Sequence, residues 1–439
     1  MLSSEPMGLT RRGFLATGGA AAAAAALPLA AQAKSRIRIA QVGTGARGVH
    51  WGADLVNNYS DVATLVGLCD INAKRAKAAR EMVGADAPTY VDFDQMVRET
   101  NPDMVLVTTT DAAHSAYIIR AMELGRDVLT EKPLCTDEAQ AQAILDAEKK
   151  YGKKLIVAFN ARHYPQAMKI KQLLQEKAIG QVLSVDYQEY LDTSHGASYF
   201  RRWHRVKELS GTLLVSKSCH HFDQVNWWLD AAPVEVMAYG DLKFYGKNHP
   251  YRSTHCRVCP HQRKCPFYWD VTKNPTSMKL YVECESDDGY LIDGCVWRQD
   301  VNIYDTYSVL VNFANGARLT YTANTFLPYE GQEIAINGSQ GRIDFNMYGG
   351  GGYQDFQLRM TRTFGKSELV TGLPQRAGGH GGADPSLRDL IFRDYDQPDP
   401  LGLKASSLAG AYSSLVGIAA YRSIERGGER VKIADLVKL

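Results

Sequence analysis

The sequence has almost no excess of charge of either sign. Its 50 lysines and arginines are balanced by 48 aspartates and glutamates, which leaves a formal net charge of +2. The basic residues are spread along the chain and form no single stripe, so the sequence gives no reason to expect a nucleic-acid partner. The 439 residues also contain no internal repeat and no long linker. We therefore expect an ordinary globular protein of two or three domains.

Long apolar runs are lacking too. An alanine-rich stretch at residues 20–30 is short for a membrane span and has no charged flank on its far side, so we expect no stable membrane insertion. It follows a twin-arginine pattern, Thr10-Arg11-Arg12-Gly13-Phe14-Leu15, and precedes a typical cleavage site, Ala31-Gln32-Ala33. These features predict a signal peptide over residues 1–33, the twin-arginine export machinery as a partner, and a periplasmic or secreted protein. An uncleaved N-terminal anchor is the alternative.

After this segment, apolar strands alternate with helices. Strands are expected at residues 37–42, 63–68, 104–108 and 127–130, and the first three are each followed by a helical stretch. This spacing is typical of a parallel, doubly wound sheet. Residues 34–158 are therefore predicted to form a Rossmann domain of the α/β class.

A second domain with a different pattern of polar and apolar residues follows at residues 159–385. Its segments alternate in polarity and are joined by turns such as Asn315-Gly316 and Asn337-Gly338, which favours a large, mainly antiparallel sheet. Strands are expected over residues 183–191, 234–244, 307–313, 318–326, 333–336 and 342–345, and one apolar helix over residues 211–230. We predict a C-terminal α+β domain, with a helical segment at residues 386–439 packing back on the core.

A glycine-rich turn lies between the first strand and the first helix. Gly43-Thr44-Gly45-Ala46-Arg47-Gly48 has the spacing that lets a chain turn tightly, approach a pyrophosphate and pack helix against strand. Asp70 lies 22 residues beyond Gly48, at the end of the second strand, where a carboxylate can bind the adenosine ribose. The pattern predicts bound NAD. Asp70 disfavours NADP, although Lys74 and Arg75 weaken that preference, and a purely structural turn is the alternative.

Further motifs carry a resemblance to a known family. They are Glu131-Lys132-Pro133 after the fourth strand, Thr109 and His114 after the third, the domain junction Asn160-Ala161-Arg162-His163-Tyr164-Pro165, and the segment Leu213–Asp223 with His220. Together they resemble the Gfo/Idh/MocA family over nearly all of the mature chain. That family includes glucose–fructose oxidoreductase, inositol dehydrogenase and a branch of NAD-dependent glycoside hydrolases.

The resemblance implies roles for these residues. Lys132 would lie beside the nicotinamide and the reacting sugar carbon, and His220 would act as the base, a task that suits an imidazole of ordinary pKa about 6.5. Many dehydrogenases of the family have an aspartate four residues before this histidine, where the present chain has Ser216. Another group must then share the proton transfer, and the candidates are Lys217, His221 and Tyr164. Cofactor contacts are expected from Thr109, His114, Glu131, Asn160 and Arg162.

Two segments are candidates for contacts with a sugar. Tyr199, Arg202 and Trp203 belong to a short run rich in rings and guanidinium groups, which can stack on a pyranose and bind its hydroxyls. An interface or a packed turn would have the same composition. His380 lies in a glycine-rich loop, and a similar stretch occurs in the family's glycoside hydrolases. A simple loop is the alternative there.

Eight cysteines are present, and three of them fall within ten residues. Cys256, Cys259 and Cys265 form this group, with Cys295 as a fourth member and Cys284 as its competitor. Such a set suits a structural zinc ion that pins an insertion near residues 250–296. Disulfides and free thiols are the alternatives, and an iron–sulfur cluster is less favoured.

The motifs support an enzyme that passes a hydride between a sugar hydroxyl carbon and tightly bound NAD. A redox-neutral glycoside hydrolase is one alternative, and a non-catalytic sugar-binding or sensor protein is another. Export favours a closed redox cycle, because no free NAD pool is expected outside the cytosol. The open sheet that the resemblance implies predicts a homodimer or homotetramer, since an exposed sheet face must be covered.

Overall fold

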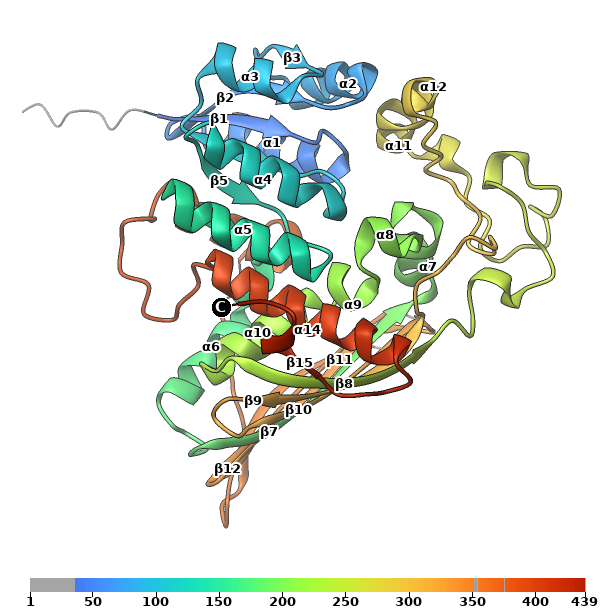
Figure 1. Cartoon of the computed structure of the whole chain (residues 1–439). Coiled ribbons are helices and arrows are strands. Elements are labelled where there is room, and N and C mark those ends of the chain that lie inside the picture. Colours follow the sequence, from blue (N-terminus) through green and yellow to red (C-terminus); the bar gives the residue numbers. More distant parts are fainter. Residues whose placement is uncertain (1–35, 351, 353, 375, 439) are drawn as a thin grey trace, which may run out of the picture. The chain divides into compact units, whose positions relative to one another are not determined.

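Two β-sheets organise the protein (Figure 1). The computed structural model describes residues 36–350, 352, 354–374 and 376–438, and the chain from Arg36 onward forms one compact unit. The predicted signal peptide at residues 1–33 lies outside the described residues. Within the described ranges, no helix combines the length and the apolar character needed to cross a membrane.

The first sheet is parallel and has six strands in the order β3-β2-β1-β4-β5-β6. Reversal of the strand order beside β1 is the mark of a doubly wound fold and places the ligand crevice at the carboxyl ends of β1 and β4. The predicted Rossmann sheet is therefore confirmed. Its strands are β1 Ile37–Val42, β2 Ala63–Cys69, β3 Thr89–Tyr90, β4 Met104–Val107, β5 Asp127–Thr130 and β6 Leu155–Val157.

The helices of this domain begin and end at recognisable signals. The Asn72 and Asp137 side chains accept hydrogen bonds from backbone N–H groups in the first turns of α2 and α5. Gly84 and Gly152 end the same two helices in the left-handed conformation. The helices are α1 Ala46–Asn58, α2 Ala73–Val83, α3 Phe93–Thr100, α4 His114–Glu123 and α5 Glu138–Tyr151.

The second sheet has nine strands in the order β14-β13-β12-β11-β7-β10-β9-β8-β15. Only β7 and β10 pair in parallel among the described strands of this sheet, so the prediction of a mainly antiparallel sheet is confirmed. The β11–β12 turn lies at Ser339-Gln340, because Gly338 pairs with Gly341. The strands are β7 Val182–Asp192, β8 Pro233–Asp241, β9 Thr306–Phe313, β10 Arg318–Leu327, β11 Glu330–Gly338, β12 Gly341–Gly349, β13 Asp355–Arg362, β14 Ser367–Leu369 and β15 Val431–Lys432.

Helices cover one face of this sheet and separate it from the Rossmann sheet (Figure 1). The helix α14, Ser407–Glu425, contacts β8 on one side and α5 on the other. The apolar helix expected over residues 211–230 is broken into α9, Leu213–Ser216, and α10, Cys219–Leu229. The remaining helices of this layer and its edges are α6 Pro165–Gln175, α7 Thr193–Arg201, α8 Lys207–Ser210 and α13 Ala383–Phe392.

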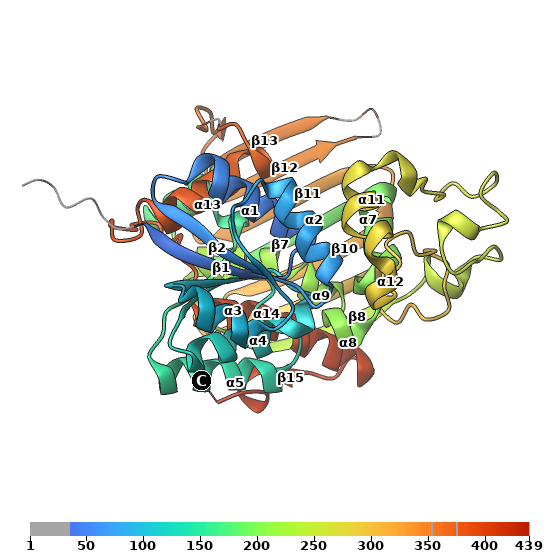
Figure 2. The same cartoon turned by 90° about the horizontal axis from the view of Figure 1, so that it is seen from above.

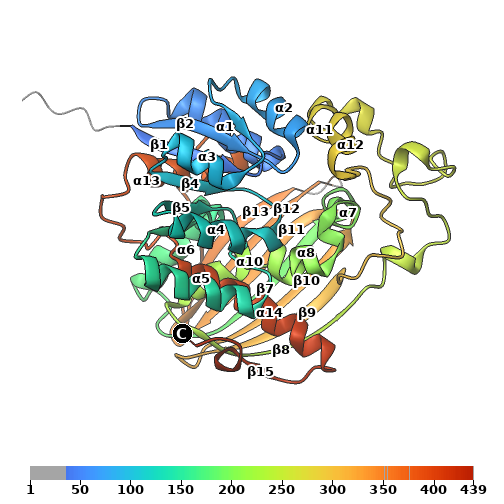
Figure 3. The same cartoon turned by 45° about the horizontal axis from the view of Figure 1, so that its top comes forward.

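A long insertion between β8 and β9 carries the clustered cysteines. It contains two short helices, α11 Pro275–Leu280 and α12 Glu285–Asp288. All three views place these helices beside α2 of the Rossmann domain (Figures 1, 2 and 3). The insertion therefore reaches back to the edge of the sheet where the glycine-rich turn lies.

Candidate active site

The glycine-rich turn joins β1 to α1 in the conformation that a phosphate site needs. Gly43 has a φ of +87°, and a Cβ atom there would lie 2.6 Å from the backbone of Thr108. A Cβ atom at Gly48 would lie 2.3 Å from the carbonyl oxygen of Gly43, so both positions require glycine. Gly45 precedes α1 and has no side chain to cap it, so the first backbone N–H groups of α1 can face an anion, apart from that of Ala46, which donates to the Tyr281 hydroxyl at 2.8 Å. The turn therefore fits the pyrophosphate of a dinucleotide.

Asp70 is held at the end of β2 by its own neighbours. Its Oδ2 accepts hydrogen bonds from the Thr44 N–H at 2.9 Å and the Thr44 hydroxyl at 3.0 Å. Its Oδ1 accepts from the Asn72 N–H at 2.9 Å and from Arg75 Nη1 at 3.3 Å. The carboxylate is thus fixed directly beside the turn, where the sequence expects the ribose contact.

Arg47 links the turn to two distant acids. Its Nε lies 2.5 Å from Oε1 of Glu131, which also accepts a hydrogen bond from Trp51 Nε1 at 2.8 Å. Its Nη1 and Nη2 donate to the carboxylate of Asp384, at 3.0 and 3.3 Å. Burial alone would raise the pKa of Glu131, but the Arg47 and Lys132 charges outweigh it and lower that pKa. Glu131 is therefore ionised and orients the segment that carries Lys132.

Asp384, at the start of α13, gathers residues that the sequence assigned to different roles. Besides Arg47 it accepts from Asn160 Nδ2 at 2.8 Å, and its Oδ2 lies 2.9 Å from Nδ1 of His380. Burial would raise the Asp384 pKa, yet the His380 and Arg47 contacts lower it far below its ordinary value. Through Asp384, the glycine-rich loop that carries His380 is thereby connected to Arg47 of the glycine-rich turn.

Lys132 reaches from the Rossmann domain into the second domain. Its Nζ donates to the backbone carbonyl of Ser216 at 2.9 Å. Burial favours the neutral amine, but the acidic groups around it, Cys219, Tyr199, Asp111 and Glu131, together raise the pKa of Lys132. The lysine is accordingly a fixed cation at the carboxyl edge of the parallel sheet.

His220 lies at the start of α10 as a neutral imidazole. Its Nδ1 is buried and has no hydrogen-bond partner among the described residues. Burial, together with the charges of Lys132 and Lys217, lowers the pKa of His220 well below its ordinary value. The ring meets Phe159 edge to face, with centroids 6.1 Å apart. A neutral ring with a free nitrogen beside a cationic lysine is suited to accept a proton from a hydroxyl.

His221 and Lys217 share a buried carboxylate, Glu189 on β7. The carboxylate lies 3.3 Å from Lys217 Nζ and 3.5 Å from His221 Nε2. His221 Nδ1 is 2.8 Å from the hydroxyl of Tyr321. Burial lowers the pKa of His221 to about 4. These contacts occupy both ring nitrogens, which distinguishes His221 from the free His220.

Asp111 supplies a carboxylate close to Ser216, the position where the resemblance leads us to expect an aspartate. It is buried just after β4, and its Oδ2 has no hydrogen-bond partner in the described part of the chain. Burial raises the pKa of Asp111 to about 7, although Lys132 and a hydrogen bond from Ser216 act in the opposite direction. Position 216 thus contacts both Lys132 through its carbonyl and Asp111 through its side chain.

Sequence reasoning missed Asp111 and Glu189, although each left a signal. Asp111 lies in the segment that follows the carboxyl end of β4, where ligands of doubly wound sheets bind. On β7 the buried face runs through Val185, Tyr187, Glu189 and Leu191. A charged residue within such an apolar alternation indicates a buried polar network.

The other expected cofactor residues have their polar groups engaged by the chain. His114 is buried, with Nδ1 2.7 Å from the carbonyl of Pro133 and Nε2 3.3 Å from that of Thr109. Arg162 forms a two-pronged buried pair with Asp223, with N–O distances of 2.7 and 2.6 Å. His114 therefore supports the segments at Thr109 and Pro133, and Arg162 supports the domain junction. The contacts of both residues to a cofactor remain predictions.

The aromatic run expected to bind a sugar lies near Lys132 and Asp111. Tyr199 is among the groups that raise the Lys132 pKa, and the Arg202 charge acts on Asp111. Within the run, the Arg202 guanidinium lies 5.7 Å from the centre of the Tyr199 ring. Trp203 stacks on His204 with centroids 3.6 Å apart. Tyr164 is half-buried; burial raises its pKa, and the Lys217 charge opposes that rise.

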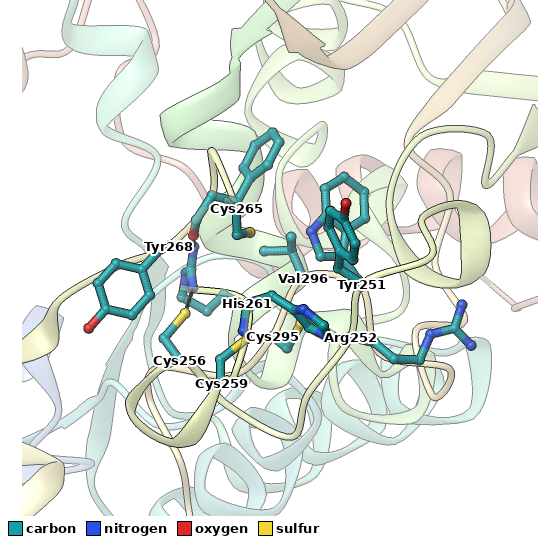
Figure 4. A pocket seen from close by; sticks show the side chains of 12 residues that line it. Tyr251, Arg252, Cys256, Cys259, His261, Cys265, Tyr268, Cys295 and Val296 are labelled. Carbon is teal, nitrogen blue, oxygen red and sulfur yellow. Dashed lines mark hydrogen bonds between the residues drawn. The ribbon is translucent and has the colours of Figure 1, made fainter. Parts of the chain in front are cut away.

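The cysteine cluster corrects the zinc expectation. Cys256, Cys259, Cys265 and Cys295 line one pocket, as Figure 4 shows, around a cavity of about 10 Å³. All eight cysteines are nevertheless free, and no group of three or more His, Cys, Asp or Glu among the described residues is arranged to hold a metal ion. The buried Arg201 guanidinium donates to Cys256 Sγ at 3.0 Å, and a cation there opposes a second one. The geometry matches the free-thiol alternative.

Comparison with known sequences identifies both domains. Residues 37–159 match the model of an oxidoreductase family with an NAD-binding Rossmann fold, Gfo/Idh/MocA, and residues 171–433 match the C-terminal α/β domain of the same family. A Bacillus subtilis protein that bears the name oxidoreductase YteT is 36% identical over 391 residues, which cover 84% of this chain and 91% of the relative. An inositol 2-dehydrogenase/D-chiro-inositol 3-dehydrogenase of Lactiplantibacillus plantarum is 30% identical over 205 residues, or 46% of this chain and 55% of the relative.

Solved structures share the fold at lower identity. An Agrobacterium radiobacter oxidoreductase in complex with NAD⁺, L-tartaric acid and magnesium superposes with a TM-score of 0.63 at 18% identity, covering 92% of this chain and all of that one. An aldose–aldose oxidoreductase of Caulobacter crescentus complexed with glycerol gives a TM-score of 0.61 at 17% identity, covering 91% of this chain and all of that one. These likenesses bear on the fold alone.

Proposed function

Because the chain belongs to the Gfo/Idh/MocA oxidoreductase family, we propose that it oxidises a hydroxyl group of a sugar or a related polyol. The observation that carries the proposal is the pairing of a cationic Lys132 with a neutral His220 that has a free ring nitrogen. The named activities of the partial relatives, inositol dehydrogenases, make a polyhydroxylated substrate the natural class.

The nicotinamide cofactor fits the residues of the first domain. A tight turn at Gly43 and Gly48 and the start of α1 would hold its pyrophosphate, and Asp70 would face its ribose. When bound, a nicotinamide supplies the two-electron acceptor for the alcohol carbon. The chain itself must bind the alcohol, hold its oxygen and remove its proton.

Lys132 and His220 divide that work. The Lys132 ammonium donates a hydrogen bond to the hydroxyl oxygen and stabilises negative charge that develops on it. The free nitrogen of His220 accepts the hydroxyl proton. Asp111, whose carboxyl titrates near neutral pH, lies within electrostatic reach of Lys132 and adjusts how strongly that ammonium binds the oxygen. Tyr199 and Arg202, which lie near Lys132 and Asp111, contact the other hydroxyls of the substrate.

NAD is the expected dinucleotide, because the cationic side chains near Asp70 already form ion pairs with carboxylates. Arg75 is buried and binds Asp70 and Asp288, and Lys74 lies 2.8 Å from Asp287. Neither side chain is free to bind the 2′-phosphate of NADP, and Asp70 repels it. The sequence alone left Lys74 and Arg75 as arguments for NADP.

Two measurements on the purified protein test the proposal. Mass spectrometry of the denatured protein identifies any nucleotide that it carries, and absorbance at the NADH band follows turnover of free sugars, polyols and aryl glycosides. Oxidation of a sugar or polyol, either as NADH accumulation or as transfer to a second sugar, is expected. Aglycone release without net NADH would replace the proposal by a redox-neutral glycoside hydrolase. Nucleotide and sugar binding without turnover would replace it by a sensor protein.

We also propose export, on the basis of the twin-arginine pattern, and a cofactor that stays bound through each cycle. A twin-arginine substrate folds before it crosses the membrane, so the dinucleotide would be acquired in the cytosol. Retention predicts that the protein isolated from the periplasm carries about one nucleotide per chain. A nucleotide-free protein that depends on added NAD would contradict retention and leave the sugar activity untouched.

A further inference from the structure

Part of the cysteine-bearing insertion lies against the nucleotide edge of the Rossmann domain. We call residues 275–290 the strap; it comprises α11, the turn at Val282–Cys284, and α12. Figure 3 shows α11 and α12 beside the end of α2 and apart from the second sheet to which the insertion belongs. The strap therefore connects the substrate domain to the part of the site that binds the dinucleotide.

The contact at the phosphate site is made by one tyrosine. The Tyr281 hydroxyl accepts a hydrogen bond from the Ala46 N–H at 2.8 Å. A Cβ atom at Gly45 would lie 3.0 Å from the same oxygen, so the hydroxyl sits directly over the start of α1. This is where the pyrophosphate of a Rossmann dinucleotide binds. No acceptor for the Tyr281 hydroxyl proton is found in the described part of the chain, and a hydroxyl can accept one hydrogen bond and donate another.

The strap is docked firmly enough to hold this tyrosine in place. Leu280 is fully buried in the hydrophobic cluster of the Rossmann domain. Arg75 donates from Nε to the Leu280 carbonyl at 3.1 Å and places its guanidinium 5.5 Å from the centre of the Tyr281 ring.

Polar contacts extend this anchorage along the strap. Asn72 Nδ2 donates to the Cys284 carbonyl at 2.9 Å, and Arg75 Nη2 lies 2.5 Å from Asp288. Lys279 Nζ pairs with Glu81 at 2.8 Å at the opposite end of α2. Asn72 and Arg75 thus bind both Asp70 and the strap, so the ribose site and the strap share one hydrogen-bond network.

We propose that the strap clamps the bound dinucleotide, with the Tyr281 hydroxyl bridging the Ala46 N–H and a phosphate oxygen. The bridge adds a hydrogen bond to a charged acceptor, and the docked strap covers the route by which the phosphates would leave. The inference rests on the nicotinamide cofactor of the proposed function and is independent of which alcohol is oxidised. It assigns to the insertion the task of slowing cofactor release.

Release of NADH from the full-length protein tests the clamp. The protein is loaded with NADH, mixed with a large excess of NAD⁺, and the loss of bound-NADH fluorescence gives the release rate. Tyr281→Phe keeps the ring packing and removes the hydroxyl. We expect release to become about tenfold faster or more, the effect of one hydrogen bond to a charged group. Tyr268→Phe is the matched control, because Tyr268 lies in the same insertion and the hydrogen bond that its backbone N–H donates to the Cys265 carbonyl does not involve the hydroxyl.

Amide hydrogen exchange gives a second reading that does not depend on turnover. The clamp predicts slower exchange over residues 275–290 when NADH is bound, and loss of that protection in Tyr281→Phe with unchanged exchange in the core strands. Equal NADH release rates in the wild type and in Tyr281→Phe would overturn the clamp. Tighter NADH binding by Tyr281→Phe would also overturn it, because the hydroxyl would then compete with the phosphate. Failure of the proposed function is a separate result: normal NADH retention with no sugar or polyol oxidised.

Discussion

Asp111 offers a clear test, because its ionised form is expected to lower the stability of the folded protein and to support the oxidation of the alcohol. Its carboxyl has a pKa of about 7 in the folded protein against an ordinary value of 3.8. A raised carboxyl pKa means that the folded state prefers the protonated form. Below pH 4 the group is protonated in both states and costs nothing. As the pH rises from about 4 to about 7, the unfolded chain ionises first, and the folded state loses stability over that window.

The size of this loss follows from the two pKa values. At about 1.36 kcal/mol per pKa unit, the difference between about 7 and 3.8 is about 4 kcal/mol. Asp111→Asn keeps the shape and removes the charge, so it should stabilise the nucleotide-free protein by up to about 4 kcal/mol at pH 8 and by little near pH 4. Urea unfolding at a series of pH values measures the difference. Exposed Asp86→Asn is the control for the loss of one carboxylate elsewhere in the chain.

The charges facing Asp111 must be considered in reading the result. Lys132 and Arg202 favour the ionised carboxylate, while Glu131 and burial oppose it. A variant that is equally stable at all pH values, or less stable at pH 8, would refute the reasoning, since it would mean that Lys132 compensates the buried charge fully. We expect the stabilised variant to oxidise its alcohol more slowly, because the carboxylate no longer acts on Lys132.

Three further substitutions address the site and its support. Lys132→Met should lower kcat/KM by at least about 100-fold, because it removes a charged donor to the reacting oxygen. The affinity for NADH, measured by fluorescence, should be unchanged; a loss of NADH affinity as large as the loss of kcat/KM would contradict this role. His220→Asn should lower kcat by about 100-fold or more. In Asp111→Asn, which lacks the carboxyl that titrates near pH 7, the rate should persist on the acid side of pH 6.5, because burial keeps His220 neutral there; an acid limb at or above pH 6.5 in that variant would argue against this base. Asp223→Asn should cost about 3–5 kcal/mol of unfolding free energy, because it leaves the buried Arg162 guanidinium unpaired, and a melting temperature unchanged from wild type would contradict that.

The fold was predictable from the sequence because it depends on local patterns. Apolar strands before helices and the glycine-rich turn define the Rossmann sheet, and alternation such as that of β7 defines the second sheet. The predicted turn at Asn337-Gly338 was one residue pair early, since Gly338 still pairs across β11 and β12. The break between α9 and α10 at Lys217-Ser218 also escaped prediction, because the Ser218 hydroxyl is bound by two tyrosines from distant strands.

The candidate site was predictable only where a motif names it. Lys132 and His220 came from the resemblance; the surroundings of Lys132 raise its pKa, and His220 Nδ1 has no hydrogen-bond partner among the residues that the structure describes. Asp111, Glu189 and Tyr281 gain their importance from partners far along the chain, which no local pattern reveals. The cysteine spacing suggested zinc but could not show the Arg201 guanidinium, which donates a hydrogen bond to Cys256 Sγ.

The contact between Arg47 and Asp384 joins residues 337 positions apart in the sequence. A ribosome has therefore made nearly all of the chain before Arg47 can meet this partner. The nucleotide site is assembled late in synthesis, after its own strands and helices have had time to form. A chain that stops short of α13 would have the Rossmann sheet without the acid that fixes Arg47 and Asn160, so the nucleotide site is complete only once α13 has been made.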